Sequence, residues 1–175
     1  ELSVMQQRRG ANRLAQFSAL IHLIYAASAE PQRWPEALTA IAKAMKSRQA
    51  ILFTPFVDIH NGGLLFSWQI DERFVSLWSG KYIDHDIWSQ SAQRKGLWHE
   101  GAVLVDEDLT TQEVLRASIW YREFLIHMGI ARLCVGIVFG GAPGLPGTVL
   151  SVYRGPEDKP FAQEERDLMQ LLVPH

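Results

Sequence analysis

The side chains best suited to bind a small molecule are aromatic, and they gather between Trp68 and Trp120. Five of the six tryptophans fall in this stretch, together with tyrosines and phenylalanines. An indole or phenol ring buries a large apolar area and keeps one polar group, so such a cluster forms either a filled core or a pocket that stacks and hydrogen-bonds. A filled core is the simpler interpretation, and these residues alone name no ligand.

Acidic and imidazole side chains in two nearby segments form the strongest candidate for catalysis. Asp84, His85 and Asp86 are consecutive, and His99 and Glu100 follow later in the chain. Their oxygens and nitrogens would suit a divalent metal if the two segments converged. Neither segment has a recognised ligand spacing, and a Gly-x-Ser-x-Gly elbow is absent. We therefore predict no enzyme, metal or cofactor, and keep a metal-dependent enzyme that uses Asp84, Asp86 and His99 as the less favoured alternative.

The composition is that of one soluble globular domain. The chain has 175 residues, 47% of them hydrophobic and 21% charged, with a formal net charge of -2. This length suits a single core. No run of Lys or Arg supplies the basic face that nucleic-acid binding requires, and no apolar run reaches bilayer length. We expect a cytoplasmic protein with no membrane partner, in which the lone Cys134 is a small buried hydrophobe.

Amphipathic helices are expected near both ends of the chain. Residues 1–12 show no hydrophobic period and are expected to be a flexible lead-in to a single domain over 13–175. From the start of that domain, apolar residues recur at three- and four-residue steps, which predicts a helix that Pro31 ends. A second helix begins at Trp34, and its buried stripe is expected to be Leu38, Ile41, Ala42 and Met45. A last helix spans about 162–173.

Two pairs of strands are expected to form hairpins. A β-rich segment from Gln49 leads to Asn61-Gly62, which favours a tight turn into a second strand. In that strand Trp68 lies on the more apolar face, which should meet the core or a cavity. Two further strands, 132–139 and 148–154, flank a loop rich in glycine and proline. Hairpins need no crossover, so we predict an α+β domain with a central antiparallel sheet and helices on its faces.

Helices between the two strand pairs carry several of the aromatic residues. Asp71 can cap a helix in which Trp78 and Tyr82, four residues apart, share one face. A later helix, capped by a threonine and ended by Gly129, carries Tyr121 on one face, with Trp120 and Phe124 on the neighbouring flank. The aromatic side chains are therefore expected on the helices that cover the sheet.

Three stretches, taken in order, resemble a known family. They are IYAA at 24–27 leading to PQRWPEAL at 31–38, SIWYREFL at 118–125, and FAQEE at 161–165 with the final Pro-His pair. They resemble the N-terminal sensor domain of LuxR-type helix-turn-helix transcriptional regulators, in which a GAF- or PAS-like domain precedes a DNA-binding domain. The resemblance covers nearly the whole chain and implies a central antiparallel sheet, with the helix-turn-helix after residue 175. Ala162 departs from the pattern, because such domains often carry Ser or Thr there as a helix cap.

A fainter resemblance involves the pattern Phe-x3-Trp-x3-Tyr at 74–82. It is similar to acyl-homoserine-lactone receptors, which carry these types at this spacing, followed by an Asp and a Trp. The resemblance implies an indole N–H and a carboxylate that hold a ligand carbonyl and amide N–H. Here Asp84 and Asp86 lie closer to the Tyr than in those receptors, and Trp98 is the candidate for the later Trp. Because this spacing is shorter than in those receptors, we do not predict a lactone as the ligand.

We predict a small-molecule sensor domain that forms a homodimer and reaches DNA only through a helix-turn-helix absent from this chain. Its ligand-binding residues are expected to be Phe53, Trp68, Trp78, Tyr82, Asp86, Trp88, Tyr121 and Phe124. Binding would alter the packing of the terminal helices, with an energy limited to the difference in ligand affinity between two arrangements. The alternative is a dimerisation scaffold without a small ligand, in which the first and last helices pair between subunits.

Overall fold

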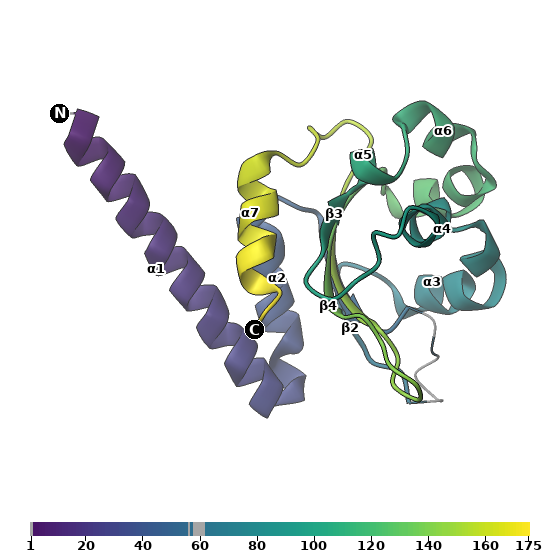
Figure 1. Ribbon diagram of the computed structural model, residues 1–175, viewed down its shortest axis with the longest axis horizontal. Helices are drawn as coiled ribbons and strands as arrows, with labels where there is room; N and C mark the ends of the chain where they lie inside the picture. Colours follow the sequence, from purple (N-terminus) through teal and green to yellow (C-terminus); the bar gives the residue numbers. More distant parts are fainter. Residues whose placement is uncertain (1, 56, 58–61) are drawn as a thin grey trace.

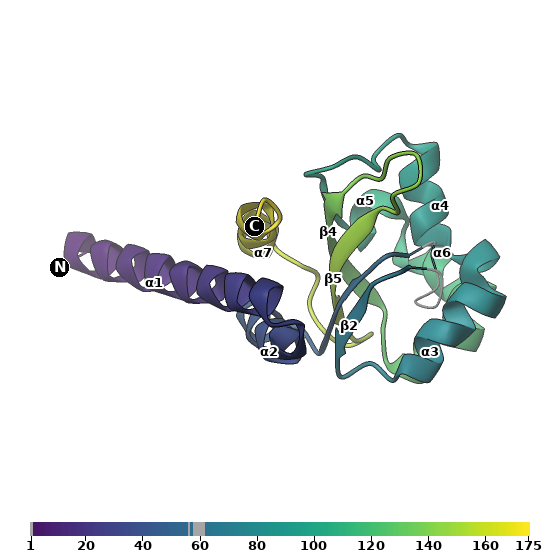
Figure 2. The same ribbon diagram turned by 90° about the horizontal axis from the view of Figure 1, so that it is seen from below.

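Five antiparallel strands form one sheet in the order β2-β1-β5-β4-β3 (Figure 1). The computed structural model describes residues 2–55, 57 and 62–175. The strands are β1 (Gln49–Phe53), β2 (Leu65–Trp68), β3 (Val103–Val105), β4 (Arg132–Phe139) and β5 (Thr148–Arg154). Helices cover both faces of this sheet (Figure 2). The predicted α+β class and both strands of the second hairpin are confirmed.

The terminal helices cover one face of the sheet. They are α1 (Leu2–Ala29), α2 (Trp34–Ala44) and α7 (Gln163–Leu172), with the 3-10 turn η1 (Pro31–Arg33) joining the first two (Figure 2). The predicted stripe of α2 is confirmed, because Leu38, Ile41, Ala42 and Met45 are all buried. Cys134 is buried in the same layer, and that burial raises the pKa of its thiol to about 12. Among the described helices none is long and apolar enough to cross a membrane.

Shorter helical segments form the second layer, on the opposite face (Figure 2). They are α3 (Glu72–Leu77), η3 (Trp78–Tyr82), η4 (Ile83–His85), α4 (Ile87–Arg94), α5 (Asp106–Leu109), α6 (Gln112–Ala117), η5 (Trp120–Phe124) and η6 (Leu125–Met128). The segments η3 and η5 are π-helical. Most of the buried aromatic side chains lie in the core between this layer and the sheet.

Local sequence signals account for several helix ends. The Asp71 carboxylate accepts the backbone N–H of Arg73 at 2.9 Å, as its predicted capping role requires. Gly129 ends η6 with a φ of 66°, a left-handed conformation that suits glycine. Ala162 precedes α7 without a side-chain cap, and its backbone N–H instead donates to the Glu165 carboxylate at 2.7 Å.

Three expectations about individual elements need correction or cannot be followed. The first helix begins at Leu2 and includes residues up to 12, which we expected to be a lead-in. The single long helix expected to end at Gly129 is interrupted, because Ser118 adopts an extended conformation and separates α6 from η5. The predicted Asn61-Gly62 turn includes Asn61, which lies outside the described residues.

Candidate ligand cavity

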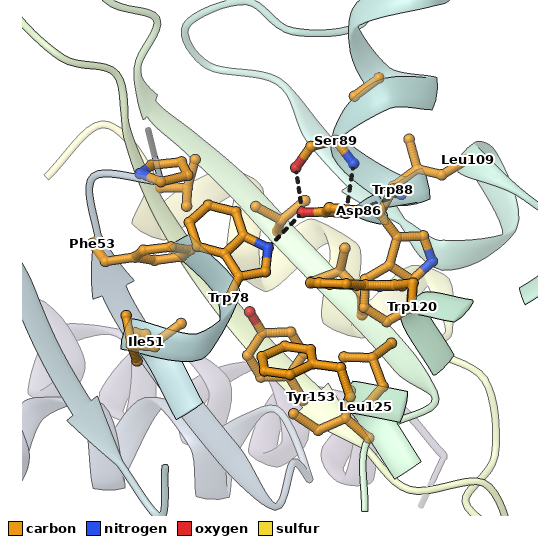
Figure 3. A pocket seen from close by; sticks show the side chains of 18 of the residues that line it. Ile51, Phe53, Trp78, Asp86, Trp88, Ser89, Leu109, Trp120, Leu125 and Tyr153 are labelled. Atoms are coloured by element: carbon orange, nitrogen blue, oxygen red, sulfur yellow. Dashed lines mark hydrogen bonds between the residues drawn. The ribbon is translucent and has the colours of Figure 1, made fainter. Parts of the chain in front are cut away.

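A cavity of about 90 Å³ lies between the sheet and the second helical layer (Figure 3). Its wall is almost entirely apolar and rich in aromatic rings. The side chains with polar atoms among those that line it belong to Asp86, Ser89, Tyr153 and four tryptophans, Trp78, Trp88, Trp98 and Trp120. The cavity therefore combines a hydrophobic interior with a few hydrogen-bonding groups, as small-molecule sites do.

Strand alternation positions the sheet side of the cavity. Ile51 and Phe53 on β1, and Val149 and Tyr153 on β5, all line it. They are two or four residues apart, and successive side chains of a strand point to opposite faces. The residue next to Tyr153, Arg154, correspondingly faces the terminal helices. Strand β5 thus contacts the cavity on one face and the terminal-helix layer on the other.

The two π-helical turns supply much of the opposite wall. Trp78 begins η3, and Trp120 and Phe124 begin and end η5. A π turn has more residues than an α turn and often marks a functional site. The Phe53 ring packs edge-to-face on Trp78 at 5.6 Å between centroids, and Trp120 packs on Phe124 at 4.9 Å. The wall is therefore built of rings that also contact one another.

The polar centre of the wall is the Asp86 carboxylate, which is 5% exposed. Its Oδ1 accepts the backbone N–H groups of Trp88 at 3.1 Å and Ser89 at 3.0 Å, so Asp86 caps α4. Its Oδ2 accepts the Ser89 hydroxyl at 2.8 Å and the Trp78 indole N–H at 3.1 Å (Figure 3). A carboxylate offers about four acceptor positions, and all of them are used.

Burial changes the protonation of two groups in this wall. It raises the pKa of Asp86, while the hydrogen bonds from Ser89 and Trp78 oppose that rise. Burial likewise raises the pKa of the Tyr153 phenol, against a hydrogen bond with the Ser151 hydroxyl. The Tyr153 phenol is therefore neutral near pH 7.

Two indole nitrogens of the wall have no hydrogen-bond partner among the described residues. They are Nε1 of Trp88 and Nε1 of Trp120, and each side chain is 4% exposed. The two rings pack edge-to-face with 6.5 Å between centroids. A buried donor left unsatisfied costs about 1 to 3 kcal/mol. The rings around the cavity therefore include two buried donors without a partner in the described part of the chain.

The structure brings together most of the predicted site residues. Those that line the cavity are Phe53, Trp78, Asp86, Trp88 and Phe124. Tyr82 and Tyr121 are buried in the same core without lining the cavity. The Tyr82 ring stacks on Phe124, and its hydroxyl donates to Glu123 at 3.4 Å. Trp68 lies apart from the cavity and packs against the core of the terminal-helix layer.

The cavity residues that are absent from the predicted set include three large aromatic ones, Trp98, Trp120 and Tyr153. Tyr153 could have been predicted from strand alternation. It lies four residues after Val149 on a predicted strand, so the two side chains point to the same face. An α-helical period places Trp120 on the flank of its helix rather than on the inner face. The segment η5 is π-helical, so its side chains do not follow that period. Trp98 follows α4 outside any helix or strand, where no period applies.

The metal-binding alternative gains no support from this geometry. Among the described residues, no group of three or more His, Cys, Asp and Glu side chains could hold a metal ion. The oxygens of Asp86 already accept four hydrogen bonds, and His99 Nδ1 lies 3.2 Å from the backbone oxygen of Glu100. Asp84, Asp86 and His99 therefore do not form a common site.

Comparison with known proteins places the fold. No protein-family model matches the chain, and no curated protein matches it. Among solved structures, it is similar to the LBD (ligand-binding) domain of VqsR from Pseudomonas aeruginosa, with a TM-score of 0.62, 16% identity, and coverage of 90% of this chain and 89% of that one. A GAF domain/HD domain protein from Geobacter sulfurreducens gives a TM-score of 0.45 at 16% identity, over 79% and 83% of the two chains. The chain thus shares its fold with the VqsR LBD domain.

Proposed function

We propose that this chain is the small-molecule-sensing domain of a cytoplasmic bacterial transcription regulator of the LuxR type. The observation that carries the proposal is the aromatic cavity of about 90 Å³ between the sheet and the second helical layer. The fold shared with the VqsR ligand-binding domain and the sequence resemblance to LuxR-type sensor domains support the same function. DNA would be contacted by a helix-turn-helix that follows residue 175.

The size of the cavity links binding to a change of shape. A cavity of about 150 Å³ holds benzene, and pockets for larger ligands span about 300 to 1,000 Å³. The present cavity is smaller than both. A ligand of more than a few atoms must therefore displace part of the wall. Its binding energy would then favour an expanded arrangement over the compact one.

Strand β5 offers a route from the cavity to the terminal helices. Tyr153 faces the cavity, and the adjacent Arg154 is buried on the other face. The Arg154 guanidinium donates to the backbone oxygens of Met45 at 2.8 Å and Pro160 at 2.9 Å, and pairs with Glu165 of α7 at 3.4 Å. A shift of β5 would therefore move the groups that Arg154 contacts at the end of α2 and the start of α7.

Tryptophan fluorescence tests the sensor proposal, because several cavity residues are indoles. Fractions of an organic extract of the host are titrated into the purified domain while emission and thermal stability are followed. We expect one fraction to change the emission and raise the melting temperature. Phe53→Leu, in the cavity wall, should weaken this response, whereas Phe66→Leu, on the opposite side of the sheet, should preserve it. No response to any fraction, or equal loss in both variants, would contradict the proposal.

A second function, dimerisation, is favoured by the exposed half of α1. Residues 4–16 are all exposed, including Val4 at 52%, Met5 at 62% and Leu14 at 69%. In Figure 1 this half of α1 extends away from the sheet. A helix without packing partners is marginally stable in water. We propose that a second copy of the chain covers it in a homodimer.

The dimer proposal is tested by measuring the mass in solution by light scattering. Leu14→Glu places a charge on the exposed face of α1 and should convert the dimer to a monomer. Leu145→Glu is the matched control, because Leu145 is 61% exposed in the loop between β4 and β5. A wild-type domain that stays monomeric at high concentration would refute the dimer.

A further inference from the structure

Tyr153 combines a polar group with surface that is open to the cavity. It lies on β5, which has a neighbouring strand on each side, and the second helical layer covers this face of the sheet (Figure 2). Tyr153 is nevertheless only half-buried, whereas Val149, on the same face of β5, is 3% exposed. Burial raises the pKa of the Tyr153 phenol, so its accessible surface lies inside the protein and opens into the cavity that it lines. In Figure 3 the Tyr153 hydroxyl points from the sheet toward Trp78.

Other polar groups of the wall are already engaged or are themselves buried. The two oxygens of Asp86 accept from two backbone N–H groups, from the Ser89 hydroxyl and from the Trp78 indole. A ligand N–H could reach this carboxylate only by displacing one of these donors, which would leave that donor unsatisfied in a buried site. The indole nitrogens of Trp88 and Trp120 are buried atoms, although their rings line the cavity. The hydroxyl of Tyr153 is therefore the better placed group to contact a ligand.

The hydrogen bond between Tyr153 and Ser151 indicates which kind of ligand atom this hydroxyl would meet. Burial raises the pKa of the Tyr153 phenol, and the bond with Ser151 opposes that rise, as donation by the Ser151 hydroxyl to the phenol oxygen does. A tyrosine hydroxyl has one proton of its own, which is then left to donate to a molecule in the cavity. On the basis of the function proposed above, we infer that the ligand is a neutral, mainly apolar molecule whose hydrogen-bond acceptor, such as a carbonyl oxygen, contacts the hydroxyl of Tyr153.

The charge of the lining residues argues against an ionic ligand. No Lys, Arg or His is among the described residues that line the cavity, and Asp86 is the acidic one. A carboxylate ligand would therefore be buried without a counter-ion, and burying an unpaired charge is very costly. An ammonium ligand would need the oxygens of Asp86, which already accept four hydrogen bonds.

Four probes of similar size separate these cases. They are 2-butanone, its alkene counterpart 2-methyl-1-butene, the anion propionate and the cation isopropylammonium. Their binding is followed in carbon-13 NMR spectra of the domain, labelled at Cζ of its four tyrosines, the ring carbon that carries the hydroxyl. Tyr→Phe variants assign the four signals, and any three of these variants suffice. Because the wild-type protein gives this readout, the test does not depend on Tyr153→Phe being stable.

We expect 2-butanone to move the Cζ signal of Tyr153 and to leave the signal of Tyr121, which is buried in the same core without lining the cavity. The ketone and the alkene differ in hydration, so the informative quantity is the ratio of their dissociation constants. Tyr153→Phe keeps the ring and removes only the hydroxyl, so it should shift this ratio in favour of the alkene by about tenfold, which is the worth of one buried hydrogen bond. The matched control, Tyr121→Phe, should leave the ratio unchanged.

Two kinds of failure can be told apart. If propionate or isopropylammonium binds more tightly than 2-butanone, or if Tyr153→Phe leaves the ratio as Tyr121→Phe does, the inferred ligand contact is wrong while the cavity remains a binding site. The same conclusion follows if 2-butanone binds without moving the Tyr153 signal in the wild type. If none of the four probes binds, the proposed sensor function fails together with the inference.

Discussion

Filling the cavity by Ala92→Leu should make the domain more stable. Ala92 lies on α4, is 3% exposed and lines the cavity. Leucine is a good helix former, so the substitution does not disturb α4 itself. The added side-chain carbons would occupy space that is now empty.

The size of the effect follows from the cavity volume. Cavities cost about 24 cal/mol per Å³, so a volume of about 90 Å³ corresponds to about 2 kcal/mol. Three added carbons at about 0.8 kcal/mol each give a similar gain. For a chain of this length, about 2 kcal/mol raises the melting temperature by about 4 to 8 °C. This gain is an upper bound, because the leucine must also adopt an allowed rotamer.

Scanning calorimetry of two variants provides the test. Ala42→Leu is the matched control, because Ala42 is also a buried helical alanine but packs in the terminal-helix core, away from the cavity. Overpacking there should destabilise the domain by about 1 to 3 kcal/mol. If Ala92→Leu lowers the melting temperature as much as Ala42→Leu does, the wall around Ala92 has no room and the cavity argument is refuted.

Four further outcomes are expected. Ala162→Ser supplies the missing cap of α7 and should stabilise the domain by about 1 kcal/mol in urea unfolding, whereas an unchanged midpoint would show that Glu165 already suffices. Gly136→Ala places a methyl group against the Val173 side chain and should destabilise the domain by about 1 to 3 kcal/mol; wild-type stability would contradict this packing. Cys134, with its pKa raised to about 12, should resist iodoacetamide at pH 8 until the domain unfolds, so rapid alkylation of the folded protein would contradict its burial. Burial raises the pKa of Asp86, so the folded state holds that proton more tightly than the unfolded chain, and the contribution of Asp86 to stability falls as the pH rises from about 3.9 through the raised value. The stability advantage of the wild type over Asp86→Asn should therefore shrink with rising pH in calorimetry, and a gap that widens would contradict this sign.

The elements predicted well from the sequence were those with strong local signals. The strands 132–139 and 148–154 have continuous β-rich runs bounded by glycine and proline, and the structure places β4 and β5 there. The Asp71 cap depends on neighbouring residues only. By contrast, residues 2–12 are helical although residues 4–12 are all exposed, so no buried stripe gave a period that could reveal the helix.

The aromatic character of the cavity wall could be predicted from the sequence, whereas its geometry could not. The aromatic stretch was correctly placed around the second helical layer, but an α-helical period was assumed where η3 and η5 are π-helical. Trp68 was ambiguous because all four residues of the edge strand β2 are half-buried. The contact between Asp86 and the Trp78 indole depends on how η3 and α4 approach each other, which no local pattern encodes.

The most direct test of the central claim is to find what the cavity holds. The domain is incubated with host extract, freed of unbound compounds by gel filtration, denatured and analysed by mass spectrometry, in parallel with Ala92→Leu. A ligand-binding cavity predicts a neutral, mainly apolar compound that the wild type retains and the filled variant does not. A wild type that retains nothing, or a compound retained equally by both proteins, would contradict the claim.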